Sequence, residues 1–158
     1  MDGEPTAPRG HDVPRVRIFV SSPGDVAEER TVALGVVRRL QGWFQGRLVL
    51  VPVLWEHEPL LATAGFQQEI DRRAAPSASD VAVFVLWSRL GTPLPPEFRL
   101  EDGRRPTGTE WEFEDAARGR KERGVPHVLV YRRSDPPQVA LTDPRFERRR
   151  EEYAAVEA

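Results

Sequence analysis

The sequence contains no cysteine, and this absence excludes disulfides, thiolate zinc sites and a cysteine nucleophile. Its three histidines, His11, His57 and His127, are too widely spaced along the chain to form a metal-ligand motif. We therefore expect no metal site. The net charge of −2 gives no electrostatic reason to expect nucleic acid or an anionic membrane as a partner.

Long hydrophobic runs are missing as well. No apolar run is long enough to cross a bilayer, and the N-terminus lacks the apolar centre of a signal peptide. These two absences favour a cytoplasmic location. The chain also has no GxGxxG or Walker motif, which argues against a classical dinucleotide-binding fold and against a P-loop enzyme.

The length and the composition of the chain are sufficient for one hydrophobic core. The chain has 158 residues, of which 39% are hydrophobic and 30% charged, so we expect a single folded domain. Residues 1–14 are rich in proline, glycine and charge and are expected to form a flexible N-terminal segment. We expect the domain to occupy residues 15–158 and to be cut from a longer multidomain protein, because its last helical stretch ends without a capping signal.

Four apolar stretches predict strands, at Val16–Val20, Leu48–Trp55, Asp80–Trp87 and His127–Tyr131. Helical patterns lie between and after them, over residues 26–44, 66–75, 109–124 and 143–158. This alternation predicts an α/β layer fold with a mainly parallel sheet and right-handed crossovers. The third stretch is apolar on both faces and is expected at the centre of the sheet, whereas Pro52 suits an edge strand.

In such sheets the ligand site lies beyond the carboxyl ends of the strands. That edge is expected to gather Ser21, Ser22, Trp55, Trp87 and Arg89. Hydroxyls and helix amides bind phosphate, tryptophans stack on bases, and arginine pairs with phosphate. Each feature also has an ordinary structural explanation: Ser22 as a helix cap, the tryptophans as closure of the core, and Arg89 as an exposed ion pair.

The segment "GTEWEFEDA", residues 108–116, holds four carboxylates. Thr109 is a good N-cap and Glu112 follows three residues later, which predicts a capping box. At about 100° per residue, Phe113, Ala116 and Ala117 should face the sheet. Glu110 and Glu112 flank that stripe, so geometry alone does not choose between them as a catalytic acid; Glu114 lies further round. A carboxylate in the first helical turn stays ionised, as cleavage of a glycosidic bond requires.

Three motifs in this order, "VRIFVSSPGDVAEER", "DVAVFVLWSRLGTPL" and "GTEWEFEDA", resemble the TIR-like (Toll/interleukin-1 receptor-like) domains of bacterial STAND-type NTPase and defence proteins. The resemblance covers about residues 15–155. It implies a flavodoxin-like three-layer sandwich and a glutamate that supports N-glycosidic cleavage near the start of the helix after the third strand. Matching the similar Gly-Thr-x-x-Glu pattern of nucleoside deoxyribosyltransferase-like proteins implies Glu112 first and Glu110 second. The TIR pattern instead has a tryptophan with a glutamate four residues later. Counted from Trp111 in this sequence, that position holds Asp115.

The resemblance implies an NAD⁺ hydrolase that releases nicotinamide, with NAD⁺ as substrate and no cofactor. Ser21, Ser22, Trp87 and Arg89 would line its pocket, and Trp55 lies on the same expected edge. The domain would act as the effector of a bacterial immune or signalling protein in anti-phage defence. It would be activated by self-association with other TIR-like domains and followed by a C-terminal NTPase or repeat module. Two alternatives stay open: a non-catalytic oligomerisation adaptor, and an N-glycosidase acting on another nucleoside or nucleotide.

Overall fold

The computed structural model describes residues 13–54, 75–138 and 140–157, and within these ranges four strands form one sheet. They are β1 (Arg15–Ser21), β2 (Val49–Val53), β3 (Val81–Leu86) and β4 (His127–Arg132). Their order across the sheet is β2-β1-β3-β4, and every neighbouring pair is parallel. The predicted α/β fold with a parallel sheet is therefore confirmed, as is the position of Pro52 on an edge strand.

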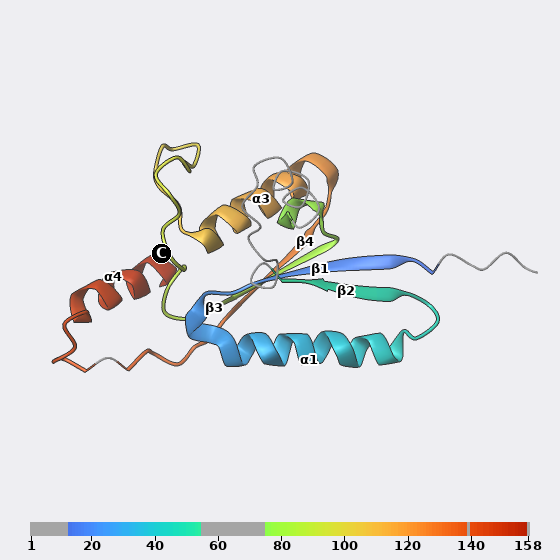
Figure 1. The fold of residues 1–158 in the computed structure, drawn as a ribbon, viewed down its shortest axis with the longest axis horizontal. Helices are drawn as coiled ribbons and strands as arrows, with labels where there is room; N and C mark the ends of the chain where they lie inside the picture. The colour runs from blue at the N-terminus through green and yellow to red at the C-terminus, as the bar shows by residue number, and fades with distance from the viewer. Residues whose placement is uncertain (1–12, 55–74, 139, 158) are drawn as a thin grey trace, which may run out of the picture.

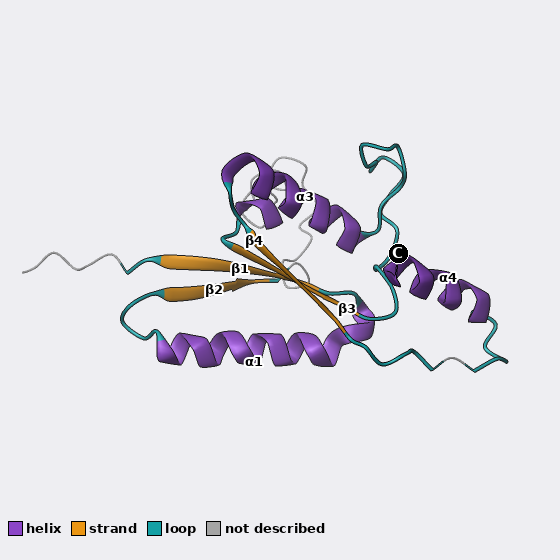
Figure 2. Ribbon diagram, turned by 180° about the vertical axis from the view of Figure 1, so that it is seen from behind, coloured by secondary structure: helices purple, strands orange, loops and turns teal. Residues whose placement is uncertain are grey.

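Two helices enclose the sheet and produce three layers. The helix α1 (Ala27–Trp43) covers one face and α3 (Gly108–Arg123) covers the other (Figure 1). The view from behind in Figure 2 shows the same arrangement. The last helix, α4 (Phe146–Glu157), lies beyond the end of the sheet, and none of its residues is buried. The strand order and the layers are compatible with a flavodoxin-like fold.

The core is divided by the alternation of side chains along β1. Ile18 and Val20 pack with Val37 of α1 on one face of the sheet. Phe19 packs with Phe84 and Ala116, and thereby with α3, on the other face. Because successive residues of a strand point to opposite faces, Ser21 ends β1 on the α3 side, and Ser22 follows on the α1 side.

The helix α3 begins at Gly108, and its capping box is not the one that the sequence predicts. Thr107 is the N-cap: its hydroxyl accepts from the Glu110 N–H at 3.3 Å, and the Glu110 carboxylate accepts from the Thr107 N–H at 2.8 Å. Thr107 and Thr109 each precede a glutamate by three residues, so the motif fits in either register. The chain before the helix selects the Thr107 register, because residues 92–94 pair antiparallel with residues 106–108 and hold Thr107 in an extended conformation. The predicted Thr109–Glu112 box is wrong.

The buried face of α3 matches the predicted one at Ala116 but differs from it at Phe113. Its buried residues are Thr109, Ala116 and Gly119, whereas Phe113 is 40% exposed and touches Phe84 only edge-on. The reason is the close packing of α3 on the short helix η3 (Pro76–Ala78), where a Cβ on Gly119 would lie 2.9 Å from the Ser77 Cβ. Small residues therefore face inward. This rotation turns Glu112, one turn before Ala116, toward the end of β1.

Several predictions fall on residues that the structure does not describe. These are Trp55, the helix over residues 66–75 apart from Ala75, and the N-terminal segment up to residue 12. In the described ranges, no helix has the length and apolar character needed to cross a membrane.

Candidate functional site

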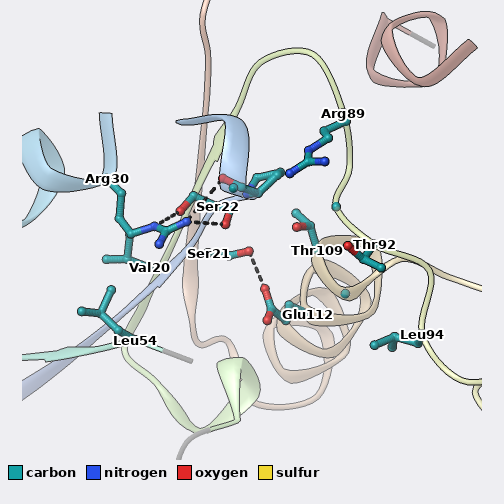
Figure 3. Close-up of a pocket in the computed structure, with 14 residues that line it drawn as sticks. Val20, Ser21, Ser22, Arg30, Leu54, Arg89, Thr92, Leu94, Thr109 and Glu112 are labelled. Carbon is teal, nitrogen blue, oxygen red and sulfur yellow. Dashed lines mark hydrogen bonds between the residues drawn. The ribbon is translucent and has the colours of Figure 1, made fainter. Parts of the chain in front are cut away.

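A cavity of about 290 Å³ opens where the loops after β1 and β3 diverge. This is the switch point of the sheet, because the chain leaves β1 toward β2 on one side and leaves β3 toward β4 on the other. Four segments supply the polar lining, and Figure 3 shows them around one hollow: Ser21 and Ser22 at the end of β1, Arg30 from α1, Arg89 and Thr92 after β3, and Thr109 and Glu112 from α3.

The central contact joins the end of β1 to α3. The Ser21 hydroxyl donates to the Glu112 carboxylate, with 2.5 Å between the two oxygens (Figure 3). Ser21 is only 2% exposed, and Glu112 is half-buried in the cavity wall. A short bond from a hydroxyl to a carboxylate oxygen fixes the direction of the acid. Glu112 therefore enters the cavity in a defined orientation, held by a strand rather than by a loop.

Ser22 lies in the opposite wall of the cavity, where it is hydrogen-bonded to α1. Its hydroxyl accepts from Nε of Arg30 at 2.5 Å, and the same guanidinium donates to the carbonyl oxygens of Ser22 and Pro23. The expectation that Ser22 caps the helix is wrong, because Pro23 is the N-cap of the short helix η1 (Gly24–Val26) and no side chain caps it. The hydroxyl instead meets an arginine that lies eight residues further along the chain.

Asp25 ties the β1 loop to the β3 loop. Its Oδ2 accepts from the backbone N–H of Ser88 at 3.0 Å and from the Ser88 hydroxyl at 2.8 Å. Its Oδ1 lies 3.6 Å from Nε of Arg89. Gly24 permits this approach, because a Cβ there would lie 3.1 Å from an Nη atom of Arg89. Arg89 is thus held at the cavity mouth by an acid from the neighbouring loop.

The structure separates the two glutamates that the sequence leaves as alternatives. Glu110 belongs to the capping box and pairs with Arg104 at 2.5 Å, and it does not line the cavity that contains Glu112. Burial acts to raise the pKa of Glu110, but the hydrogen bonds from Thr107 and Arg104 outweigh it and bring that pKa below its ordinary value. Glu110 is the acid of the first helical turn, and Glu112 follows that turn. The partial positive charge of the helix N-terminus therefore acts on Glu110.

Trp87 lies apart from this cavity. Its indole N–H donates to the carbonyl oxygen of Asp135 at 2.6 Å, and the Arg133 guanidinium lies 4.4 Å from the centre of its ring. It lines a second cavity, on the other side of Arg89. The structure thus brings Ser21, Ser22 and Arg89 to Glu112 but does not bring Trp87 there.

Arg30, Asp25 and Thr92 belong to the site but were not predicted from the sequence. Asp25 belongs to the "SSPGD" motif and Thr92 to "SRLGT", so both motifs carried a signal. Arg30 ends the motif "VRIFVSSPGDVAEER", but its contact with Ser22 was not predictable because the folded helix brings the two residues together. In the described ranges, no group of three or more histidine and carboxylate side chains is arranged to hold a metal ion.

Comparison with protein-family models, with curated proteins and with solved structures finds no match for this chain.

Proposed function

We propose that this chain is a TIR-like domain of flavodoxin-like fold that hydrolyses NAD⁺ and releases nicotinamide. The observation that carries the proposal is the carboxylate of Glu112, held by the buried hydroxyl of Ser21 in the wall of a cavity at the switch point of the sheet. Glu112 is also the residue to which the resemblance to N-glycosidic enzymes points.

The reaction requires a negative charge beside a sugar. The bond between ribose C1′ and nicotinamide breaks, and both bonding electrons leave with neutral nicotinamide. The positive charge that remains is shared by C1′ and the ring oxygen, as in other oxocarbenium-like transition states. The Glu112 carboxylate stabilises that charge; water then attacks C1′ and loses a proton, which gives ADP-ribose. Fixed orientation makes the carboxylate effective, because it need not reorganise during the reaction.

Two observations favour an enzyme over a non-catalytic adaptor. Glu112 is not the capping residue of its own helix, since Thr107 and Glu110 form the capping box. A cavity also exists between the "SSPGD" and "SRLGT" segments, and the guanidinium groups of Arg30 and Arg89 in its lining favour an anionic group such as phosphate. An adaptor needs neither feature. A nucleosidase for another substrate would use the same site, and a panel of nucleosides and nucleotides tests that alternative.

The proposed setting is a cytoplasmic effector of a larger defence protein, switched on by self-association. The outer surface of α1 supports self-association, because Val32 is 66% and Trp43 70% exposed there. Exposed apolar side chains of this size on one element are typical of interaction surfaces.

The test is nicotinamide release from NAD⁺ by the concentrated protein in a crowding agent. Glu112→Gln should lower the rate by about 100-fold or more, as the loss of one electrostatic group at a reaction centre does. Glu110→Gln is the matched control, since it changes the neighbouring acid outside the cavity, and it should keep most of the rate. An unchanged rate in the Glu112 variant, or intact NAD⁺ with the crowded wild-type protein, contradicts the proposal.

A further inference from the structure

A second cavity, of about 350 Å³, lies on the far side of Arg89 from Glu112. Its walls come from the segment after β1, the β3 loop, the segment after β4, and α4 with the residue before it. Its charged lining consists of four arginines and two acids, namely Arg89, Arg145, Arg148, Arg149, Asp25 and Glu152. A hollow with this excess of guanidinium groups favours an anionic ligand, since guanidinium forks match phosphate oxygens.

The arginines of this cavity do not serve the core. Arg145, Arg148 and Arg149 are spaced by three and four residues, so they lie on one side of the helical segment. No residue of α4 is buried, and these three side chains are between 42% and 69% exposed. Their ion pairs with Asp143 and Glu152 engage Nε in each case. The Nη ends carry most of the donors of a guanidinium and reach furthest from the helix.

Arg89 joins the two cavities because it lines both. Its Nε forms an ion pair with Oδ1 of Asp25 at 3.6 Å, and neither buried atom has a hydrogen-bond partner. A ligand that extends from the first cavity to the second passes this group.

We propose that the second cavity binds the diphosphate and adenosine half of the dinucleotide, with Arg89, Arg148 and Arg149 as phosphate ligands. The inference rests on the proposed function for the identity of the substrate. The size of the cavities supports it, because each is near the lower end of the range for small-molecule sites, about 300 Å³, and suits only part of a dinucleotide. Glu112 then acts on one half of a substrate that α4 holds by the other.

The first experiment measures binding of ADP by calorimetry at low and at physiological salt. Arg148→Ala and Arg149→Ala should each weaken ADP binding about fivefold to tenfold, as the loss of a charged hydrogen bond to phosphate does. Arg150→Ala is the control: the residue lies on the same helix, pairs with Glu147 and does not line the cavity, so ADP binding should not change. Because α4 buries no residue, all three variants should keep the thermal stability of the wild type.

The second experiment compares hydrolysis of NAD⁺ with hydrolysis of nicotinamide riboside, which has no diphosphate. The Arg148 and Arg149 variants should raise the KM for NAD⁺ and leave nicotinamide riboside hydrolysis unchanged. Wild-type protein that does not bind ADP, or an Arg150 variant that weakens ADP binding as much as the other two, overturns the inference. If ADP binds through these arginines but nicotinamide is never released, the proposed function fails and the diphosphate site stands.

Discussion

Glu110→Gln separates the structural acid of α3 from the catalytic candidate. The wild-type carboxylate accepts from the N–H and hydroxyl of Thr107, at 2.8 and 2.9 Å, and from Arg104 at 2.5 Å. The amide ends the ion pair with Arg104, whose side chain is 56% exposed, at a cost of about 0.2–1 kcal/mol. It also weakens the hydrogen bond of the capping box that the Thr107 N–H donates to the Glu110 side chain, because the acceptor is no longer charged. We expect the free energy of unfolding to fall by about 1–1.5 kcal/mol, which lowers Tm by roughly 2–6 °C in a domain of this size.

The loss of stability in the Glu110→Gln variant should also depend on pH. Burial alone would raise the pKa of Glu110, but the bonds from Thr107 and Arg104 bring it below its ordinary value of 4.5. A carboxylate whose pKa is lower in the folded state stabilises the fold fully above its unfolded pKa, and this contribution disappears as the pH falls through the folded pKa. The difference between wild type and variant should therefore be constant near neutral pH and shrink below 4.5.

Urea unfolding at several pH values, followed by circular dichroism, measures both effects. Glu114→Gln is the control for a change of charge on α3, because Glu114 is exposed and takes no part in the capping box, and it should leave stability within about 0.5 kcal/mol. A Glu110 variant as stable as the wild type refutes the assigned capping register. A loss that stays the same at low pH refutes its electrostatic origin.

Two further predictions concern packing and the loop contact. Gly119→Ala should destabilise the protein by about 1–3 kcal/mol in thermal unfolding, because its Cβ would lie 2.9 Å from the Ser77 Cβ. Gly35→Ala in α1 should instead stabilise by about 0.5–1 kcal/mol, since no atom outside the adjacent turns of the helix lies within 4 Å of the new methyl group; the same change of stability in both variants would contradict the packing of α3 on η3. Asp25→Ala should cost about 1–3 kcal/mol and Asp25→Asn less, because the amide oxygen still accepts from Ser88; an alanine variant with an unchanged Tm would show that the loops are held by other contacts.

The strands were predictable from the sequence, because dense β-branched residues and alternation between strands and helices reflect backbone preferences and burial. The edge position of Pro52 followed from its missing donor. The same reasoning brought Ser21, Ser22 and Arg89 toward one edge of the sheet, because the carboxyl ends of parallel strands meet there. These are consequences of short-range pattern and of topology.

The resemblance ranked Glu112 before Glu110, but helix geometry alone did not predict which of them lines the cavity, because two contacts outside the helix fix the start and the rotation of α3. The antiparallel pairing of residues 92–94 with residues 106–108 fixes the start of α3, and the contact of Gly119 with Ser77 fixes its buried face. The apolar ring of Phe113 suggested a different rotation, but close approach of backbones prevailed over the burial of one ring. The place of Trp87 likewise depends on Arg133 and Asp135, from a segment far along the chain.

Adjacent serines at the end of β1 serve opposite sides of the sheet, with Ser21 bonded to Glu112 of α3 and Ser22 to Arg30 of α1. Deleting one residue before Ser21 would bring Ser22 to the α3 side and Pro23 to the α1 side, so that Arg30 loses its hydroxyl partner. Inserting one residue would bring Ser21 to the α1 side, so that Glu112 loses its hydroxyl partner instead. The length of β1 is therefore constrained as strictly as the identity of either serine. Variation in a lineage of such proteins should appear as substitutions in this strand, while changes of length are confined to the loops beyond it.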